Sequence, residues 1–131
     1  MYWWEVGDIL RTKRVYDPVS PSDGRRLLVD RLWPRGLSRE RAAIDEWRRD
    51  LAPSDGLRRW YGHRPERWEE FSRRYRAELA AAGMEGELAA LARRSAAEDI
   101  TLVYAARDPA YSHAVALVRF IGEAGSPGSG L

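Results

Sequence analysis

The chain has 131 residues, which is most simply one domain, long enough to bury a hydrophobic core without a disulfide or a structural metal. It contains no cysteine, so disulfides, thiolate nucleophiles and zinc–thiolate sites are excluded. Its 22 basic and 20 acidic residues give a formal charge of +2, a balance that does not by itself indicate a nucleic-acid partner.

Three segments are predicted to be strands. They are about 8–16 (D-I-L-R-T-K-R-V-Y), 26–33 after the turn S-P-S-D-G, and 100–105 (I-T-L-V-Y-A). The last two are continuous apolar runs, typical of strands that are covered on both faces. Only about nine residues join the first two strands, and parallel pairs usually need longer crossovers, so we expect an antiparallel pair within a mixed sheet.

Helical patterns fill the segments between and after the later strands. Ser38 is predicted to cap a helix that reaches Leu51, and Ser54 a short one that Gly62 ends. Pro65 begins a longer helix that stops before Gly83, and a further helix carries Met84, Leu88 and Leu91. Asp108 is predicted to cap the last helix, which turns Ala114, Leu117, Val118 and Ile121 inward.

Strands interleaved with helices indicate an α/β fold, a small layered domain with a short, mainly parallel or mixed central sheet flanked by helices. We expect a single domain over residues 1–121 and a flexible Gly/Ser-rich tail over 122–131.

No apolar run approaches the length of a membrane span, and the start shows no signal peptide, so we expect a cytoplasmic protein. For the unexplained aromatic residues Tyr2, Trp3 and Trp4 we expect one of two roles, covering a sheet edge or forming a patch for homo-oligomers.

Charged residues stand where each predicted strand ends. Asp17 follows the first strand, Asp30, Arg31 and Arg35 lie in L-V-D-R-L-W-P-R-G, and Arg107 and Asp108 follow the third. In open α/β sheets, ligands bind beyond the carboxyl ends of the strands. If the three ends converge, these residues form one site.

Asp30 is predicted to share a strand face with Leu28 and Leu32, among apolar neighbours. A carboxylate in such a place needs a partner. Two explanations stay open: a structural ion pair with Lys13 or Arg14 on the adjacent strand, or a role in a site.

The segment A-A-R-D-P-A-Y-S-H-A runs from a strand into a helix whose N-terminus offers free N–H groups and the positive end of the dipole. His113 lies four residues before inward-facing Leu117, so we expect it to point to the top of the sheet as an acid or base. The alternative is a buried histidine that holds a loop carbonyl. Ser112 is adjacent and points elsewhere, so no serine hydrolase is predicted. His63 either caps or reaches the site.

The favoured hypothesis is a binder or enzyme for a small anionic ligand that contains a phosphate or a nucleotide. Arg31, Arg35 and Arg107 would hold the anion beside Trp33, with His113 and Asp30 as the catalytic pair. No metal site, cofactor motif or P-loop is recognisable. The alternatives are a non-catalytic interaction or regulatory protein and, less favoured, a nucleic-acid-binding module, since residues 25–49 carry eight arginines against four acidic residues.

Several blocks of the chain resemble the YeaO-like family, small bacterial proteins of unknown function (domain of unknown function 488). The blocks are K-R-V-Y-D-P, S-D-G-R-R-L-L-V-D-R-L-W-P-R-G, D-E-W-R-R-D-L-A-P-S-D-G-L-R-R-W, F-S-R-R-Y-R-A-E-L, T-L-V-Y-A-A-R-D and S-H-A, and they span residues 13–121. The resemblance implies an α/β fold but no activity. It also implies that related branches carry a cysteine directly before the last histidine, where this chain has Ser112, so thiol chemistry does not carry over.

Overall fold

Four parallel strands form the sheet in the computed structural model, which describes residues 10–125. The strands are β1 (Leu10–Arg14), β2 (Arg25–Leu28), β3 (Glu46–Trp47) and β4 (Ile100–Tyr104), in the order β1-β4-β2-β3. Leu10 of β1 and Arg25 of β2 both lie opposite Ile100, the first residue of the central strand β4. The predicted α/β fold class is confirmed. The aromatic N-terminus and residues 126–131 of the predicted tail lie outside the described residues.

The expectation of an antiparallel pair is wrong, because β1 and β2 do not pair with each other. Each of them runs parallel to β4, which lies between them. The connection over residues 15–24 therefore crosses one strand, and it contains the short helix η1 (Pro21–Asp23), which Ser20 caps. β4 takes the central position because all five of its residues are buried, so it needs a neighbour on each side.

The predicted helix from Ser38 to Leu51 is also wrong beyond its first turn. Ser38 caps α2 (Arg39–Ala42), but Ala43 adopts a left-handed conformation with φ 51° and ends it. The chain then forms β3 and the short helix η2 (Arg49–Leu51). The apolar spacing that suggested a helix instead serves a strand and a turn.

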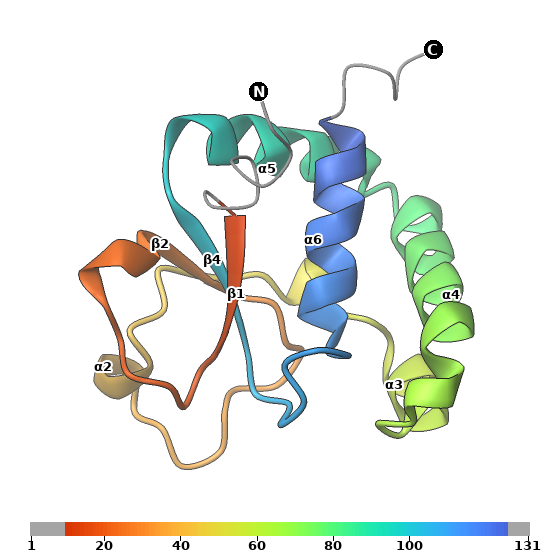
Figure 1. Cartoon of the computed structure of the whole chain (residues 1–131), viewed down its shortest axis with the longest axis horizontal. Helices are drawn as coiled ribbons and strands as arrows, with labels where there is room; N and C mark the ends of the chain where they lie inside the picture. Colours follow the sequence, from red (N-terminus) through yellow and green to blue (C-terminus); the bar gives the residue numbers. More distant parts are fainter. Residues whose placement is uncertain (1–9, 126–131) are drawn as a thin grey trace.

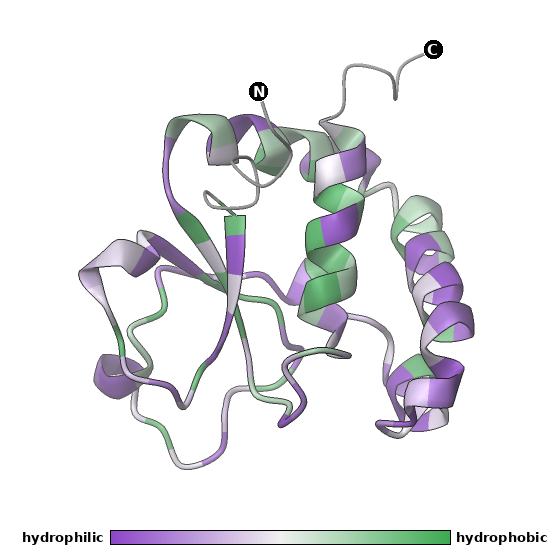
Figure 2. Cartoon of the chain, viewed as in Figure 1, coloured by the Kyte–Doolittle hydropathy of each residue, from purple (hydrophilic) through white to green (hydrophobic). Residues whose placement is uncertain are grey.

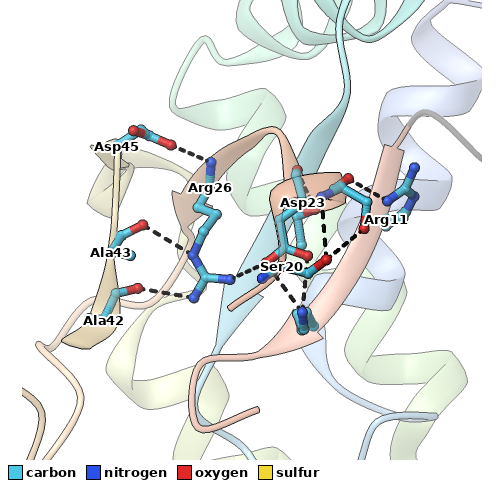
Figure 3. A network of polar contacts seen from close by, with 10 residues as sticks. Arg11, Ser20, Asp23, Arg26, Ala42, Ala43 and Asp45 are labelled. Carbon is cyan, nitrogen blue, oxygen red and sulfur yellow. Dashed lines mark hydrogen bonds and ion pairs between the residues drawn. The ribbon is translucent and has the colours of Figure 1, made fainter. Parts of the chain in front are cut away.

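A buried arginine explains this change of direction. The guanidinium of Arg26 donates from Nε to the Ala43 carbonyl (3.1 Å) and from Nη2 to the Ala42 carbonyl (3.0 Å). Its backbone N–H donates to the Asp45 carboxylate (2.9 Å), and its Nη1 lies 2.7 Å from Asp23 Oδ2 (Figure 3). Arg26 thus replaces the next helical turn as the donor to the last carbonyls of α2.

The later helices follow their predicted signals more closely. They are α3 (Asp55–Tyr61), capped by Ser54, then η3 (Pro65–Arg67), α4 (Trp68–Ala81), α5 (Glu85–Ala97) and α6 (His113–Ala124). The last helix begins at His113, not at Asp108, because the Asp108 carboxylate accepts the N–H groups of Ala110 and Tyr111 in a tight turn. It also continues to Ala124, past the predicted start of the tail at Gly122.

The two faces of the sheet bury different cores. Ile100, Leu102 and Tyr104 point to the face that α6, α4 and α5 cover, and Val103 points to the smaller cluster around Ala42 of α2. Figure 1 shows α2 on the opposite side of the strands from α6 and α4. Figure 2 shows α6 mostly apolar and α4 polar over much of its surface, as expected of an inner and an outer helix. Within residues 10–125, no helix combines the length and apolar character needed to cross a membrane.

Candidate functional site

A cleft of about 850 Å³ lies at the carboxyl ends of β2 and β4. Its wall comes from the second residue after β2, the last turn of α3 with the turn that follows, one residue of α4, the loop after β4 and the start of α6. The lining residues are Asp30, Arg58, Arg59, Tyr61, Gly62, His63, Phe71, Ala105, Ala106, Arg107, Asp108, Tyr111, Ser112 and His113. This is the edge at which parallel α/β sheets usually hold ligands.

Asp30 and His113 meet in the wall of this cleft, and both side chains are largely buried. His113 Nε2 lies 3.0 Å from the Val29 carbonyl oxygen and 3.0 Å from Asp30 Oδ1. Because a carbonyl oxygen can only accept a hydrogen bond, Nε2 carries the ring proton and donates a hydrogen bond to the Val29 carbonyl. His113 therefore holds a loop carbonyl, which was the structural alternative for this residue.

Asp30 takes neither of the partners that the sequence suggested. Lys13 Nζ lies 3.0 Å from Asp23 Oδ1, and Arg14 donates to the Ala106 carbonyl (2.8 Å). Instead, Asp30 Oδ2 accepts the Ala105 N–H (2.9 Å). The strand ends at Leu28, so Asp30 and Leu32 do not share a strand face, and Leu32 is 63% exposed.

Two polar atoms in the cleft wall are buried and accept or donate no hydrogen bond within the described chain. They are Ser112 Oγ and Asp30 Oδ1, which lies 3.0 Å from His113 Nε2 although the proton of that nitrogen is directed to Val29. Ser112 is the N-cap of α6, yet its side chain accepts no cap bond. The hydroxyl of Ser112 lies near that of Tyr104. Burial raises the pKa of Tyr104 by more than this neighbouring hydroxyl lowers it, and the two hydroxyls do not have the geometry of a hydrogen bond. An unsatisfied buried group costs about 1–3 kcal/mol, and such costs gather at functional sites.

Three arginines and a second histidine line the same cleft as this helix start. Arg58 faces Asp55 at 3.4 Å, but neither Arg59 nor Arg107 makes an ion pair within residues 10–125. His63 follows Gly62, and both residues have left-handed conformations, with φ of 57° and 56°. The cleft therefore combines unpaired cations with the N-terminus of a helix, an arrangement that suits an anion.

Aromatic residues form the other wall. The Tyr61 hydroxyl donates to the Tyr111 carbonyl (2.8 Å), and the ring of Tyr61 stacks on Phe71 with centroids 4.2 Å apart. Burial, with the charges of Asp108 and Tyr111, raises the pKa of Tyr61 to about 12, so it is a neutral donor at physiological pH. Tyr111 itself is 41% exposed at the cleft and lies edge-on to Trp68.

Three of the six predicted site residues line this cleft, namely Asp30, Arg107 and His113, and three do not. Arg31 lies 3.6 Å from Asp55, and both side chains are exposed. Trp33 packs edge-on against Trp47, and its indole N–H donates to the Leu37 carbonyl (2.7 Å). The Arg35 side chain is exposed, and its carbonyl accepts the Tyr16 hydroxyl (2.9 Å).

Sequence reasoning missed Arg58, Arg59, Tyr61 and Tyr111, which come from a helix and a loop rather than from strand ends. The block W-Y-G-H-R-P held a usable signal, because its glycine predicts a turn that ends the helix carrying Arg58, Arg59 and Tyr61. Within residues 10–125, no three carboxylate or imidazole groups gather as metal ligands.

Comparison with known proteins places the chain among uncharacterised bacterial relatives. It is 43% identical over 112 residues to the uncharacterized proteins Mb3100c of Mycobacterium bovis and Rv3073c of Mycobacterium tuberculosis, which covers 86% of this chain and 92% of each relative. It is 40% identical over 113 residues to the uncharacterized protein YeaO of Escherichia coli, which covers 86% of this chain and 96% of YeaO. No solved structure matches the chain significantly.

A family model described as "Inactive DUF488-N3 subclade" matches residues 9–127, nearly the whole chain. That match and the identity to YeaO agree with the sequence blocks around Asp30 and His113. The chain therefore belongs to the YeaO-like DUF488 family.

Proposed function

We propose that the protein binds a small anionic ligand, containing a phosphate or a nucleotide, in the cleft at the carboxyl ends of β2 and β4, and does not convert it. One observation carries the proposal. Ser112 Oγ is buried without a hydrogen-bond partner at the N-terminus of the 12-residue helix α6, in a cleft that Arg59 and Arg107 also line.

The first N–H groups of a helix have no acceptor within the helix, and the helix dipole makes this end positive. The hydroxyl of Ser112 can donate to an anion at the same place, which would remove the cost of leaving it unsatisfied. Arg59 and Arg107 add positive charge, and neither forms an ion pair within residues 10–125. A phosphate would use all three kinds of donor together.

Two observations favour binding over catalysis. His113 Nε2 donates to the Val29 carbonyl, so this nitrogen is not free to accept a proton from a ligand. The matching family model is described as an inactive subclade, which agrees with a ligand that is bound but not converted. The role of Asp30 in the proposal is to position His113 and the Ala105 N–H in the wall of the cleft.

The test is binding of inorganic phosphate and of AMP to the purified chain at fixed ionic strength, measured by calorimetry and by thermal shift. We expect both probes to bind and to raise the Tm. Arg107→Ala should weaken binding by about tenfold, the usual size for a lost charge-assisted contact of about 1.4 kcal/mol. Proton NMR of AMP during long incubation should show no new product.

The matched control is Arg35→Ala, which removes the same charge from an exposed position outside the cleft. It should bind both probes as the wild type does. If neither probe binds the wild type, or if Arg35→Ala and Arg107→Ala lose the same affinity, the cleft is not the anion site.

A further inference from the structure

The cleft is much larger than an inorganic anion. Its volume of about 850 Å³ falls in the range of pockets that hold small organic ligands, about 300–1,000 Å³. An anion at Ser112 and Arg107 would leave most of this space empty. The ligand therefore has an organic body in addition to its charged group.

Tyr111 offers a surface for such a body. Tyr111 lines the cleft and is 41% exposed, although its backbone is held at both ends. Its N–H faces the Asp108 carboxylate (3.4 Å), and its carbonyl accepts the Tyr61 hydroxyl (2.8 Å). Trp68 supports the ring from the side, with centroids 5.5 Å apart. A fixed, exposed aromatic ring in a cleft is a platform on which a planar group can stack.

The charge of the cleft limits how much negative charge it can hold. Its lining carries three arginines against two aspartates, a formal charge of +1 with both histidines neutral. Asp30 and Asp108 both line the cleft, so a second or third phosphate would meet like charge there. This balance suits one phosphate better than a chain of them.

We propose that the ligand is a nucleoside monophosphate, with its phosphate at the N-terminus of α6 and its base against Tyr111. Tyr111 and Ser112 are consecutive residues, with Cα atoms about 3.8 Å apart, so one mononucleotide can reach both. This inference rests on the proposed function and adds to it the class of ligand.

Four probes separate the parts of the ligand: AMP, ribose 5-phosphate, inorganic phosphate and ATP, each titrated calorimetrically into the full chain. AMP should bind about tenfold tighter than ribose 5-phosphate, since stacking of one base on an aromatic side chain is usually worth about that factor. ATP should bind no tighter than AMP. Tyr111→Ala should remove the preference for AMP and leave ribose 5-phosphate unchanged, whereas Tyr111→Phe should keep the preference.

Tyr16→Ala is the control, because Tyr16 is a similarly exposed aromatic residue (44%) that does not line the cleft. If inorganic phosphate and ribose 5-phosphate bind in an Arg107-dependent way but AMP binds no tighter, the nucleotide inference is wrong and the anion site stands. The nucleotide inference is equally wrong if Tyr111→Ala leaves the preference for AMP unchanged. If no probe binds, the proposed function fails and the inference fails with it.

Discussion

Asp23 and Arg26 form the most buried ion pair among the described residues, with residue exposures of 5% and 3%. Burial pushes the pKa of Asp23 upward, but hydrogen bonds from Lys13, from the Ser20 N–H and from Arg26 outweigh it, so the pKa is lowered overall. The pair also joins three segments, because Arg26 reaches the end of α2 (Figure 3) and Lys13 of β1 donates to Asp23. Its role is to fix how these segments meet.

We predict that Asp23→Asn destabilises the protein by about 3 kcal/mol at pH 7, because it leaves the Arg26 charge buried with a neutral partner. Urea unfolding measures this loss. The lowered pKa means that the Asp23 carboxylate stabilises the fold above the pKa of an unfolded aspartate, about 3.9, and that this stability disappears as the pH falls through the folded pKa. The difference between wild type and variant should therefore shrink below about pH 4.

Asp99→Asn is the matched control. Its partner Arg11 is 3.5 Å away, and both side chains are well exposed, so the loss should stay below about 1 kcal/mol. If Asp23→Asn costs no more than Asp99→Asn, the buried pair does not organise these segments.

At the same scale, the sequence predicted the positions of Asp30 and His113 better than their partners. The block around Asp30 and His113 predicted that both lie near the carboxyl ends of the strands, and both line the cleft. The contacts of Asp30 and His113 depend on where β2 ends. The strand stops at Leu28, and the carbonyl of the next residue, Val29, accepts a hydrogen bond from His113. A local sequence pattern cannot specify this contact, because it joins residues 84 positions apart.

Among the elements, the tightest constraint lies in the turn before β2. Gly24 has φ 64° and ψ −134°, a backbone conformation that residues with a side chain rarely adopt. A Cβ there would lie 2.3 Å from the carbonyl oxygen of Asp99, which precedes β4. The turn allows this close approach, and the Arg25 N–H donates to that same carbonyl (3.0 Å).

We predict that Gly24→Ala lowers the free energy of unfolding by more than about 3 kcal/mol, since backbone strain of about 1–3 kcal/mol adds to a clash with rigid backbone. Gly36→Ala separates the two effects, because Gly36 has φ 80° but open space around its Cβ position. It should lose only the strain. Equal losses in the two variants, measured by denaturant titration, would show that the contact with Asp99 is not close.

Element prediction succeeded where local signals decide and failed where a distant partner decides. Ser54 and Gly62 bound α3 as predicted, because capping and a left-handed C-cap are local. The segment after Ala42 became β3 because Arg26 takes the role of the next helical turn and Leu27 pairs with Glu46. Likewise, the order of β1 and β2 depends on β4, which comes about 70 residues later in the chain.

For the whole molecule, the main core is rich in buried aromatic side chains. Tyr75 and Tyr104 are almost fully buried in it, and burial raises the pKa of both. Tyr61 joins them at the edge of the cleft, where its pKa is about 12. These hydroxyls are neutral in the folded protein at pH values where an unfolded tyrosine, with a pKa of about 10, has begun to ionise.

We predict that the protein loses stability steeply above pH 10. A folded pKa that is raised above the unfolded value means that the stability is complete below about pH 10 and is lost as the pH rises through the folded pKa, about 12 for Tyr61. Tyr61 alone should make the free energy of unfolding fall by nearly 1.4 kcal/mol per pH unit, because the folded state holds about one more proton than the unfolded state. Urea unfolding at pH 8, 10 and 11 measures the total slope, and Tyr61→Phe should reduce it by that share.

Tyr16→Phe is the control. It also removes a hydroxyl that donates to a backbone carbonyl, but the Tyr16 residue is exposed, so the slope should not change. A slope that is the same in wild type and Tyr61→Phe would mean that the Tyr61 hydroxyl is not held neutral at the cleft.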